Sequence, residues 1–323
     1  MYLVLRTTFI DLINAVSRQG KGYPTLKEDD IKSIRFPKKI VDVLVKQEGE
    51  LIEKIIPIKD EIQSLKTTKE LKINIINKVF GKAFGFSWEE FEKLSREKVY
   101  KISFSKLNSS IDFRSATKFH SIKYNFLNLP VFNRFKFKDF SDSMSLGRQI
   151  TPSDFEEESQ YYYLMPNAIK TFNLEVDILK PISETFYKRF QHISLKNGDL
   201  LLAASGEGTI GKTAIYNSEK DAVTSQFIMK IELNDKSLTN YFHYYMQSSY
   251  FQLTVEKFKK GMGNMTNIFV SQVKDFPILY DEQKVSEISA EIKSQLDKQN
   301  EIDKLIEEKQ QLIDKIINDY VTK

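Results

Sequence analysis

Two segments, one near each end of the chain, repeat apolar residues at alternating intervals of three and four. In the second segment these positions are Val285, Ile288, Ile292, Ile302, Ile306, Ile313, Ile316 and Tyr320. In the first segment they are Leu44, Leu51, Ile55, Ile58, Ile62, Leu65, Ile76 and Val79. Because this spacing lines apolar side chains along one face of an α-helix, we predict a long amphipathic helix over 38–85 and another over 281–323.

The two predicted helices are best explained as a scaffold, in which they pair with each other or with helices of a partner. One such helix alone could equally pack against a globular core, but two of similar length favour the scaffold. Pro57 lies inside the first segment. It is expected to kink or restart that helix, because proline removes a backbone hydrogen bond.

Length and composition predict a soluble, folded chain of about two domains. The 323 residues are 41% hydrophobic and 28% charged, as in ordinary globular proteins. No run of about 18 apolar residues occurs, so we expect no membrane span, and Met1–Ile10 lacks the form of an export signal. The chain has no cysteine, which excludes disulfides and thiolate metal sites and fits a cytoplasmic protein.

Charge is spread unevenly along a chain whose net charge is only +4. Residues 101–150 hold nine Lys or Arg against three Asp, whereas residues 151–185 hold seven acidic residues against two Lys. Aromatic residues are interleaved with the basic ones, most regularly over Arg134–Phe140, which has the alternation of a strand. Basic residues among aromatic ones can bind nucleic acid, but aromatic strands more often belong to a core and charged patches to a solvated surface, so the core is the favoured interpretation.

An internal repeat relates the beginning of the chain to a segment near its end. Tyr2–Val16 and Tyr241–Val255 are both helix-like, and each is followed by glycines, a short strand with a proline and one of the long helices. A large domain, residues 86–280, precedes and includes the second copy, whereas the first copy, residues 1–37, begins abruptly at Met1. We expect either that a first domain is missing or that another polypeptide supplies it.

The sequence of the central domain predicts a β-sheet with a glycine-rich loop between two of its strands. Strands are expected over Tyr161–Leu164, Leu200–Ala204, Thr213–Tyr216 and Phe227–Leu233, with the loop at Ser205–Lys212. Together with the long helices, these strands predict an α+β fold: a mixed α/β domain flanked by two long coiled-coil-like helices.

Gly206–Thr213 matches the phosphate-binding pattern G-x-x-x-x-G-K-[ST]. In a nucleotide-binding loop a helix begins at the lysine and directs its N-terminus at the phosphate. Here Ala214–Asn217 has the pattern of a strand and a turn instead. We therefore disfavour an ATP-using enzyme and expect a structural loop, with Lys212 available to a DNA phosphate.

We find no catalytic or metal-binding constellation. His120, His192 and His243 lack the spacing of metal ligands, and Glu156–Glu158 is a charge run rather than an arranged acid and base. Asn128–Phe132 only faintly resembles the N-P-P-F motif of adenine methyltransferases. We expect a non-catalytic chain with no cofactor and no metal.

The segment Leu195–Leu202, followed by Ser205-Gly206 and Ile210-Gly211-Lys212, resembles the target-recognition domain of type I restriction-modification specificity subunits. The order of the later segments is also similar to that family: Tyr241–Tyr245, Gly261–Gly263, Val273–Pro277 and Asp281–Gln283 before a long helix. The resemblance implies four parts: a C-terminal remnant of a first recognition domain (1–37), a first spacer helix (38–85), a recognition domain (86–280) and a second spacer helix (281–323).

The resemblance implies a subunit that binds double-stranded DNA and directs adenine methylation by partner methyltransferase subunits. In the family, two antiparallel helices hold two recognition domains apart, methyltransferase subunits dock on these helices, and a restriction subunit can join. A chain with one recognition domain would bind one half-site or self-associate through its long helices. By position, DNA contacts are expected from Ser205, Thr209, Lys212, Arg148, Lys188, Arg189, Asn264 and Thr266, each of which could instead be a turn or surface residue.

Two alternatives stay open from the sequence. The chain could be the recognition domain and helical tail of a split or truncated adenine methyltransferase, or of a type IIG-like restriction enzyme. It could also be a helical scaffold that does not recognise DNA.

Overall fold

The computed structural model describes residues 48–87, 90, 93, 124, 127–206, 208–261 and 266–321. The predictions for residues 1–37 and for Asn264 lie outside these described residues. The chain divides into two compact units, each described by itself below. The described part of the first unit is 48–70 with 297–321, and that of the second lies between Leu71 and Leu296.

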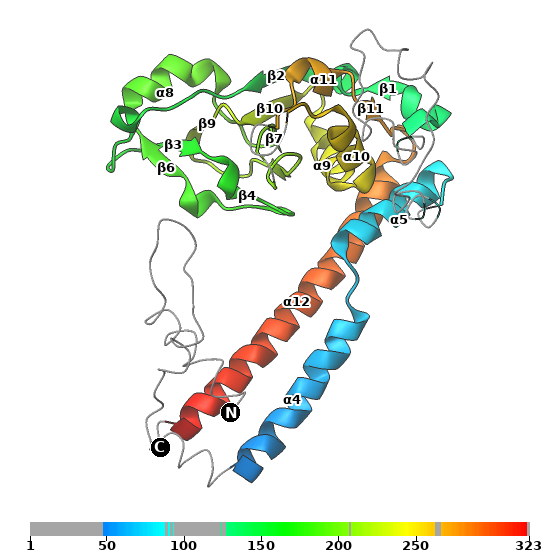
Figure 1. The fold of residues 1–323 in the computed structure, drawn as a ribbon, viewed down its shortest axis with the longest axis vertical. Helices are drawn as coiled ribbons and strands as arrows, with labels where there is room; N and C mark the ends of the chain where they lie inside the picture. The colour runs from blue at the N-terminus through cyan, green and yellow to red at the C-terminus, as the bar shows by residue number, and fades with distance from the viewer. Residues whose placement is uncertain are drawn as a thin grey trace. The chain divides into compact units, whose positions relative to one another are not determined.

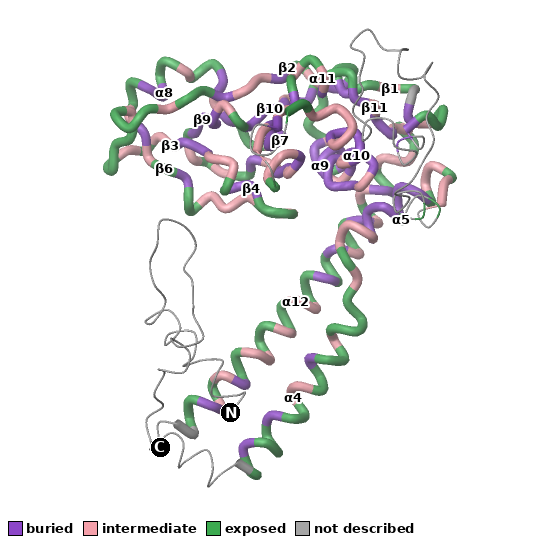
Figure 2. The backbone as a smooth tube through the Cα atoms, viewed as in Figure 1, coloured by how far each residue is buried: buried purple, intermediate pink, exposed green. Residues whose placement is uncertain are grey.

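The first unit is a pair of helices, α4 (Glu48–Thr68) and the C-terminal part of α12 (Val285–Val321), drawn in Figure 1. Two ion pairs fix their direction: Lys309 pairs with Glu61, and Asp303 pairs with Lys69. Positions therefore rise along one helix as they fall along the other, so the helices are antiparallel. The buried seam between them consists of Leu51, Ile55, Ile62, Ile313 and Ile317. Figure 2 shows buried positions recurring along both helices, which confirms the predicted amphipathic pair.

The first long helix is interrupted, but not where the sequence suggested. Pro57 lies inside α4, and the helix continues through it, so the prediction of a restart there is wrong. Because proline has no N–H, the carbonyl of Glu53 lacks its helical hydrogen-bond donor. Both Glu53 and Pro57 are exposed, so water can hydrate that carbonyl. The helix ends at Thr68, and a second helix, α5 (Lys72–Phe84), begins after the extended residue Leu71.

The second unit contains two main sheets. The first has the order β2-β10-β7-β8 and is antiparallel throughout, and the second has the order β6-β3-β9. Their strands are β2 (Ser141–Leu146), β3 (Tyr161–Leu164), β6 (Lys180–Ile182), β7 (Leu200–Ala203), β8 (Thr213–Ile215), β9 (Asp221–Thr224) and β10 (Ile228–Leu233). Strand β3 pairs parallel with β9, Leu164 facing Thr224. The four strands predicted for this domain are confirmed, each within one residue at either end.

The described residues of the second unit also form two short ribbons. Strand β1 (Phe135–Lys136) pairs with β11 (Pro277–Ile278), and β4 (Ile169–Lys170) pairs with β5 (Asn173–Leu174). The strand expected over Arg134–Phe140 is therefore only partly present, because its second half forms a 3₁₀ turn over Phe137–Phe140. In such a turn residues three apart share one side, and both phenylalanines are buried. The aromatic residues at 137 and 140 thus belong to the core rather than to a binding face.

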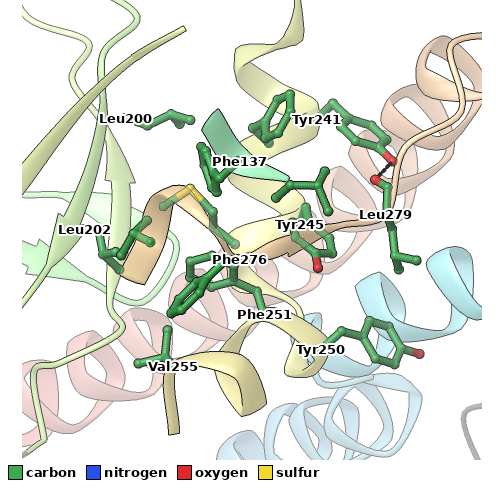
Figure 3. Packing of buried hydrophobic residues seen from close by; sticks show 14 of the residues in the cluster. Phe137, Leu200, Leu202, Tyr241, Tyr245, Tyr250, Phe251, Val255, Phe276 and Leu279 are labelled. Carbon is green, nitrogen blue, oxygen red and sulfur yellow. Dashed lines mark hydrogen bonds between the residues drawn. The ribbon is translucent and has the colours of Figure 1, made fainter. Parts of the chain in front are cut away.

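In the described part of this unit, short helices accompany the sheets: α8 (Glu184–Phe190), α9 (Thr239–Gln247), α10 (Ser249–Phe258) and α11 (Val270–Lys274). The helix-like segment 241–255 is divided at Ser248, whose hydroxyl accepts a hydrogen bond from Phe251 N and caps α10. Figure 3 shows the aromatic core around α9 and α10, where the Tyr241 hydroxyl donates to Leu279 O at 2.6 Å. Helix α5 and the first residues of α12, Ile288 and Ile292, share this core.

Candidate nucleic-acid interface

The glycine-rich loop leaves β7 and returns directly into β8. Its ends are tied together, because Gly211 N donates to Ala203 O at 2.9 Å and Ala203 N donates to Lys212 O at 2.8 Å. The Thr209 hydroxyl closes the loop by donating to Ser205 O at 2.8 Å. Since a strand rather than a helix follows the loop, the geometry of a nucleotide-binding loop is absent at this motif. The expectation that a strand rather than a helix follows the loop is confirmed, and the availability of Lys212 to a DNA phosphate stays a prediction.

The loop is also fixed against helix α10. Gly211 has φ 88°, and a side chain there would lie 2.6 Å from Gln252 Oε1. Gln252 Nε2 in turn donates to Gly211 O at 2.8 Å. Ser205 and Thr209 are half-buried, and so is Lys212 at the end of the loop. The predicted residues Ser205, Thr209 and Lys212 therefore form one rigid group.

Thr266 joins this group through its backbone rather than its side chain. Its carbonyl accepts a hydrogen bond from Gly206 N at 3.1 Å, and the next residue, Asn267, forms a β-bridge with Ser205. Thr266 itself is buried. The structure therefore brings Thr266 beside the loop, in a position where its carbonyl supports the loop backbone, and its DNA contact stays a prediction.

A second group of predicted residues lies around Phe190 at the end of α8. The guanidinium carbons of Arg148 and Arg189 lie 5.8 Å and 5.2 Å from the centre of the Phe190 ring. Lys188 is exposed and forms an ion pair with Glu184 at 2.7 Å. Arg148 and Arg189 thus come together at Phe190, although 41 positions separate them, and Lys188 is adjacent to Arg189 in α8.

Close backbone packing holds Arg148 in place. The preceding residue, Gly147, approaches Thr224 so closely that a Cβ there would lie 1.9 Å from Thr224 O. Arg148 N donates to the same oxygen at 2.9 Å, and Arg148 O accepts from the Tyr163 hydroxyl at 2.6 Å. Burial raises the pKa of Tyr163 to about 12, so this hydroxyl stays protonated and keeps donating at neutral pH.

One turn connects the two groups. Ser225 forms a parallel β-bridge with Arg148, and two residues later Phe227 O accepts a hydrogen bond from Ala204 N at 2.8 Å. Ala204 immediately precedes the glycine-rich loop. The turn 225–227 was not predicted as part of a site, because Phe227 at the start of an apolar run has the sequence pattern of a core strand.

A buried ionic cluster supports the turn before β7. The Asp199 carboxylate is fully buried, lies 3.5 Å from Lys230 Nζ, and accepts from Lys196 N at 2.8 Å. Lys230 Nζ also donates to Ser194 O at 2.8 Å. Burial raises the pKa of Asp199, while the hydrogen bond from Lys196 N and the nearby lysines oppose that shift. The aspartate of the Asn197-Gly198-Asp199 turn therefore has a structural role.

The described residues offer little for other chemistry. They contain no group of three or more His, Cys, Asp or Glu placed to hold a metal ion. Among the helices of the described ranges, none is long and apolar enough to cross a membrane.

Comparison with known proteins identifies one family. The family model of the type I restriction modification DNA specificity domain matches residues 132–313, more than half of the chain. A solved chain concerned with complex assembly and conformational transition of the type I R-M system is 12% identical, with a TM-score of 0.49 over 99% of this chain and 70% of that one. No curated protein sequence matches the chain.

Two further solved structures are similar. One is the S subunit of the type I restriction-modification system from M. genitalium, 11% identical, with a TM-score of 0.45 over 99% of this chain and 71% of that one. The other is the HsdS subunit from Thermoanaerobacter tengcongensis, 10% identical, with a TM-score of 0.41 over 99% of this chain and 68% of that one.

Proposed function

The chain belongs to the type I restriction modification DNA specificity family, and from this premise we propose that its second unit recognises a short sequence in duplex DNA. The bound chain then directs partner methyltransferase subunits to that site, where they methylate adenine. The chain itself contributes recognition and positioning, and its partners contribute catalysis. We propose DNA contacts for the loop residues Ser205, Thr209 and Lys212, for Arg148, Lys188 and Arg189, for Thr266, and for Asn264, which lies outside the described residues.

The observation that carries this proposal is the meeting of the two groups of residues at the turn 225–227. The loop supplies the Ser205 hydroxyl and Lys212, with Thr209 holding the loop closed, and the α8 group supplies two arginines and a lysine. Cations and hydroxyls are the usual partners of DNA phosphates, and they set the register of a protein on the duplex. The hydrogen bonds that tie the ends of the loop support this role, since a loop held in place before binding loses less entropy on binding.

Apolar residues on the first unit support a helical partner. Ile52 and Ile56 on α4 are exposed, as are Leu305 and Leu312 on α12. These side chains lie outside the seam that joins the two helices. We assign them to the docking of a methyltransferase subunit, or of a second copy of the chain, and a restriction subunit can join the same assembly. The proposed parts remain a remnant at 1–37, a spacer at 38–85, a recognition domain at 86–280 and a second spacer at 281–323.

Selection from a randomised duplex library tests the proposal. The chain would be copurified with its candidate methyltransferase, and the methyltransferase alone would serve as the control. We expect enrichment of one short half-site only when the chain is present, and a palindromic pair of half-sites if two copies associate. If, at low salt, the bound duplexes show the same sequences with and without the chain, the proposal is overturned.

A further inference from the structure

Phe190, the last residue of α8, has two arginine guanidinium groups over its ring. The guanidinium carbon of Arg148 lies 5.8 Å from the ring centre, and that of Arg189 lies 5.2 Å from it. Both distances fall within the range of about 6 Å in which a cation is attracted to the face of an aromatic ring. Phe190 therefore connects two cations that come from distant parts of the sequence.

Other side chains of the second unit hold the Phe190 ring. The ring centre of Phe186, one helical turn earlier, lies 4.9 Å away, with the two ring planes at 62°. Phe190 is half-buried and packs against the buried cluster that contains Phe186, Tyr187 and Ile182. A ring held in this way gives the two guanidinium groups a fixed surface to contact.

The two arginines differ in how their own side chains are held. Arg148 Nη1 donates to Leu146 O and to Gly147 O, both at 3.2 Å. Among the described residues, the Arg189 guanidinium forms no hydrogen bond or ion pair, so the ring of Phe190 is its main contact. An arginine that is not fixed loses side-chain freedom when it binds a ligand. The ring therefore reduces the entropy that Arg189 in particular loses on binding.

The charge around the ring indicates which ligand fits it. Hydrogen bonds from Thr151 lower the pKa of Asp154, and the charge of Arg189 does so to a lesser degree. The Asp154 carboxylate accepts from Thr151 N at 2.9 Å and from the Thr151 hydroxyl at 2.6 Å. Two guanidinium groups on one ring repel each other, so anions that contact them are bound favourably. The phosphates of duplex DNA are such anions, and the planar guanidinium fork matches their geometry.

We infer that Phe190 is a positioning residue: its ring holds Arg148 and Arg189 so that both guanidinium groups contact the phosphate backbone of bound duplex DNA. The inference rests on the proposed function, in which both arginines contact DNA, and adds to it the residue through which they act together. Phe190 itself needs no contact with DNA. Because phosphate contacts carry no base information, the ring contributes to affinity and register rather than to the choice of sequence.

A double-mutant cycle tests this role. Phe190→Leu keeps an apolar side chain and removes the ring face, and it would be made in the wild-type chain and in an Arg148→Ala/Arg189→Ala chain, each copurified with the methyltransferase. In the wild-type chain we expect about 5- to 30-fold weaker binding, because two arginines must then be ordered on binding. The loss should be similar for the duplex enriched in the selection and for a scrambled duplex. In the chain without the two arginines, Phe190→Leu should change binding by less than about twofold.

The salt dependence of binding separates the position of the arginines from their charge. Phe190→Leu keeps both charges, so the slope of the logarithm of the binding constant against the logarithm of salt concentration should stay unchanged. Arg148→Ala/Arg189→Ala removes two phosphate contacts and should lower this slope by about two. Phe190→Tyr keeps an aromatic face and should bind within about twofold of wild type.

Phe84→Leu is the matched control. Phe84, in α5 of the same unit, is also half-buried, its ring centre lies 6.3 Å from that of Phe80, and Lys284 Nζ lies 5.7 Å from its ring centre. No DNA contact is proposed for Lys284. Phe84→Leu should therefore leave binding within about twofold of wild type. A loss as large as that of Phe190→Leu would show that both substitutions act through general packing, and it would overturn the inference.

Three further results would overturn it: no loss from Phe190→Leu in the wild-type chain, the same loss with and without the two arginines, or an unchanged salt slope when both arginines are removed. Binding by Phe190→Tyr as weak as that by Phe190→Leu would also contradict a role for the ring face. If the wild-type chain shows no preferred sequence in the selection, the proposed function fails. A wild-type preference together with equal losses in both backgrounds rejects only the role of Phe190.

Discussion

Asn77 of α5 and Ser249 of α10 exchange two hydrogen bonds across the core of the second unit. Asn77 Nδ2 donates to Ser249 Oγ at 2.9 Å, and Ser249 N donates back to Asn77 Oδ1 at 2.8 Å. Asn77 is fully buried. This pair joins a helix that follows the first spacer segment to a helix that packs against the glycine-rich loop.

Asn77→Leu should destabilise the second unit by about 1–3 kcal/mol, because it places an apolar side chain at a fully buried position and leaves the half-buried Ser249 N–H and hydroxyl without their partner. Urea denaturation followed by circular dichroism would measure the change in the unfolding free energy. Lys78→Leu, on the exposed side of the same helix, is the matched control and should stay within about 0.5 kcal/mol of wild type. Equal effects of both substitutions would contradict a structural role for the pair.

Pro57→Ala should stabilise the first unit. The substitution restores the donor for the exposed carbonyl of Glu53 and replaces proline with the best helix former, which should raise the unfolding free energy by about 1–3 kcal/mol. Ile56→Ala, at an exposed neighbour that keeps its backbone N–H, should change it by less than about 1 kcal/mol. Thermal unfolding at fixed protein concentration would measure both, and no gain for Pro57→Ala would show that α4 is already adapted to proline.

His243 makes the second unit sensitive to acid. Its ring is buried in α9, its Nδ1 has no hydrogen-bond partner among the described residues, and burial lowers its pKa to about 4 from 6.5. The unfolded chain therefore binds a proton at a higher pH than the folded one. Above about pH 6.5 the neutral His243 does not lower the unfolding free energy. As the pH falls from 6.5 toward 4, the unfolding free energy decreases by up to roughly 3 kcal/mol because of this residue.

His243→Phe should remove this component of the pH dependence. The difference in unfolding free energy between wild type and variant should be constant above about pH 7 and should shift in favour of the variant between about pH 6.5 and pH 4. Urea denaturation at several pH values would measure it, with the exposed His192→Phe as the control. Parallel pH profiles for wild type and His243→Phe would refute the assignment.

The sequence predicted those elements whose pattern is local. Heptad spacing identified α4 and α12, and apolar runs identified β7 and β10. Both patterns follow from the order of residues alone, because a helix with one buried face and a buried strand each require apolar residues at regular positions. The position of the break in the first helix was not predictable in this way. Proline at position 57 is tolerated because it faces solvent, and exposure is a tertiary property.

The sequence suggested candidate contact residues one by one, but it did not show how they are arranged. Nothing in the sequence places Arg148 beside Arg189, since their proximity depends on the shared contact with Phe190. The sequence around Thr266 has the composition of a surface loop, yet Thr266 is buried beside the glycine-rich loop. Phe227 has the pattern of a core strand, yet its ring is exposed. Side-chain direction at the end of a strand is set by the neighbouring chain segments, here those that bind Ala204.

The salt dependence of DNA binding distinguishes a phosphate contact at Lys212 from a purely structural lysine. Neutralising one phosphate releases condensed counterions, so the logarithm of the binding constant falls with the logarithm of salt concentration by about 0.9 per contact. Lys212→Ala should therefore lower this slope by about one and weaken binding to all duplexes similarly. Lys212→Arg keeps the charge and should keep the slope. Lys82→Ala removes an exposed lysine of α5 in the same unit and serves as the matched control. An unchanged slope for Lys212→Ala, with weaker binding, would mean that Lys212 acts only by holding the loop.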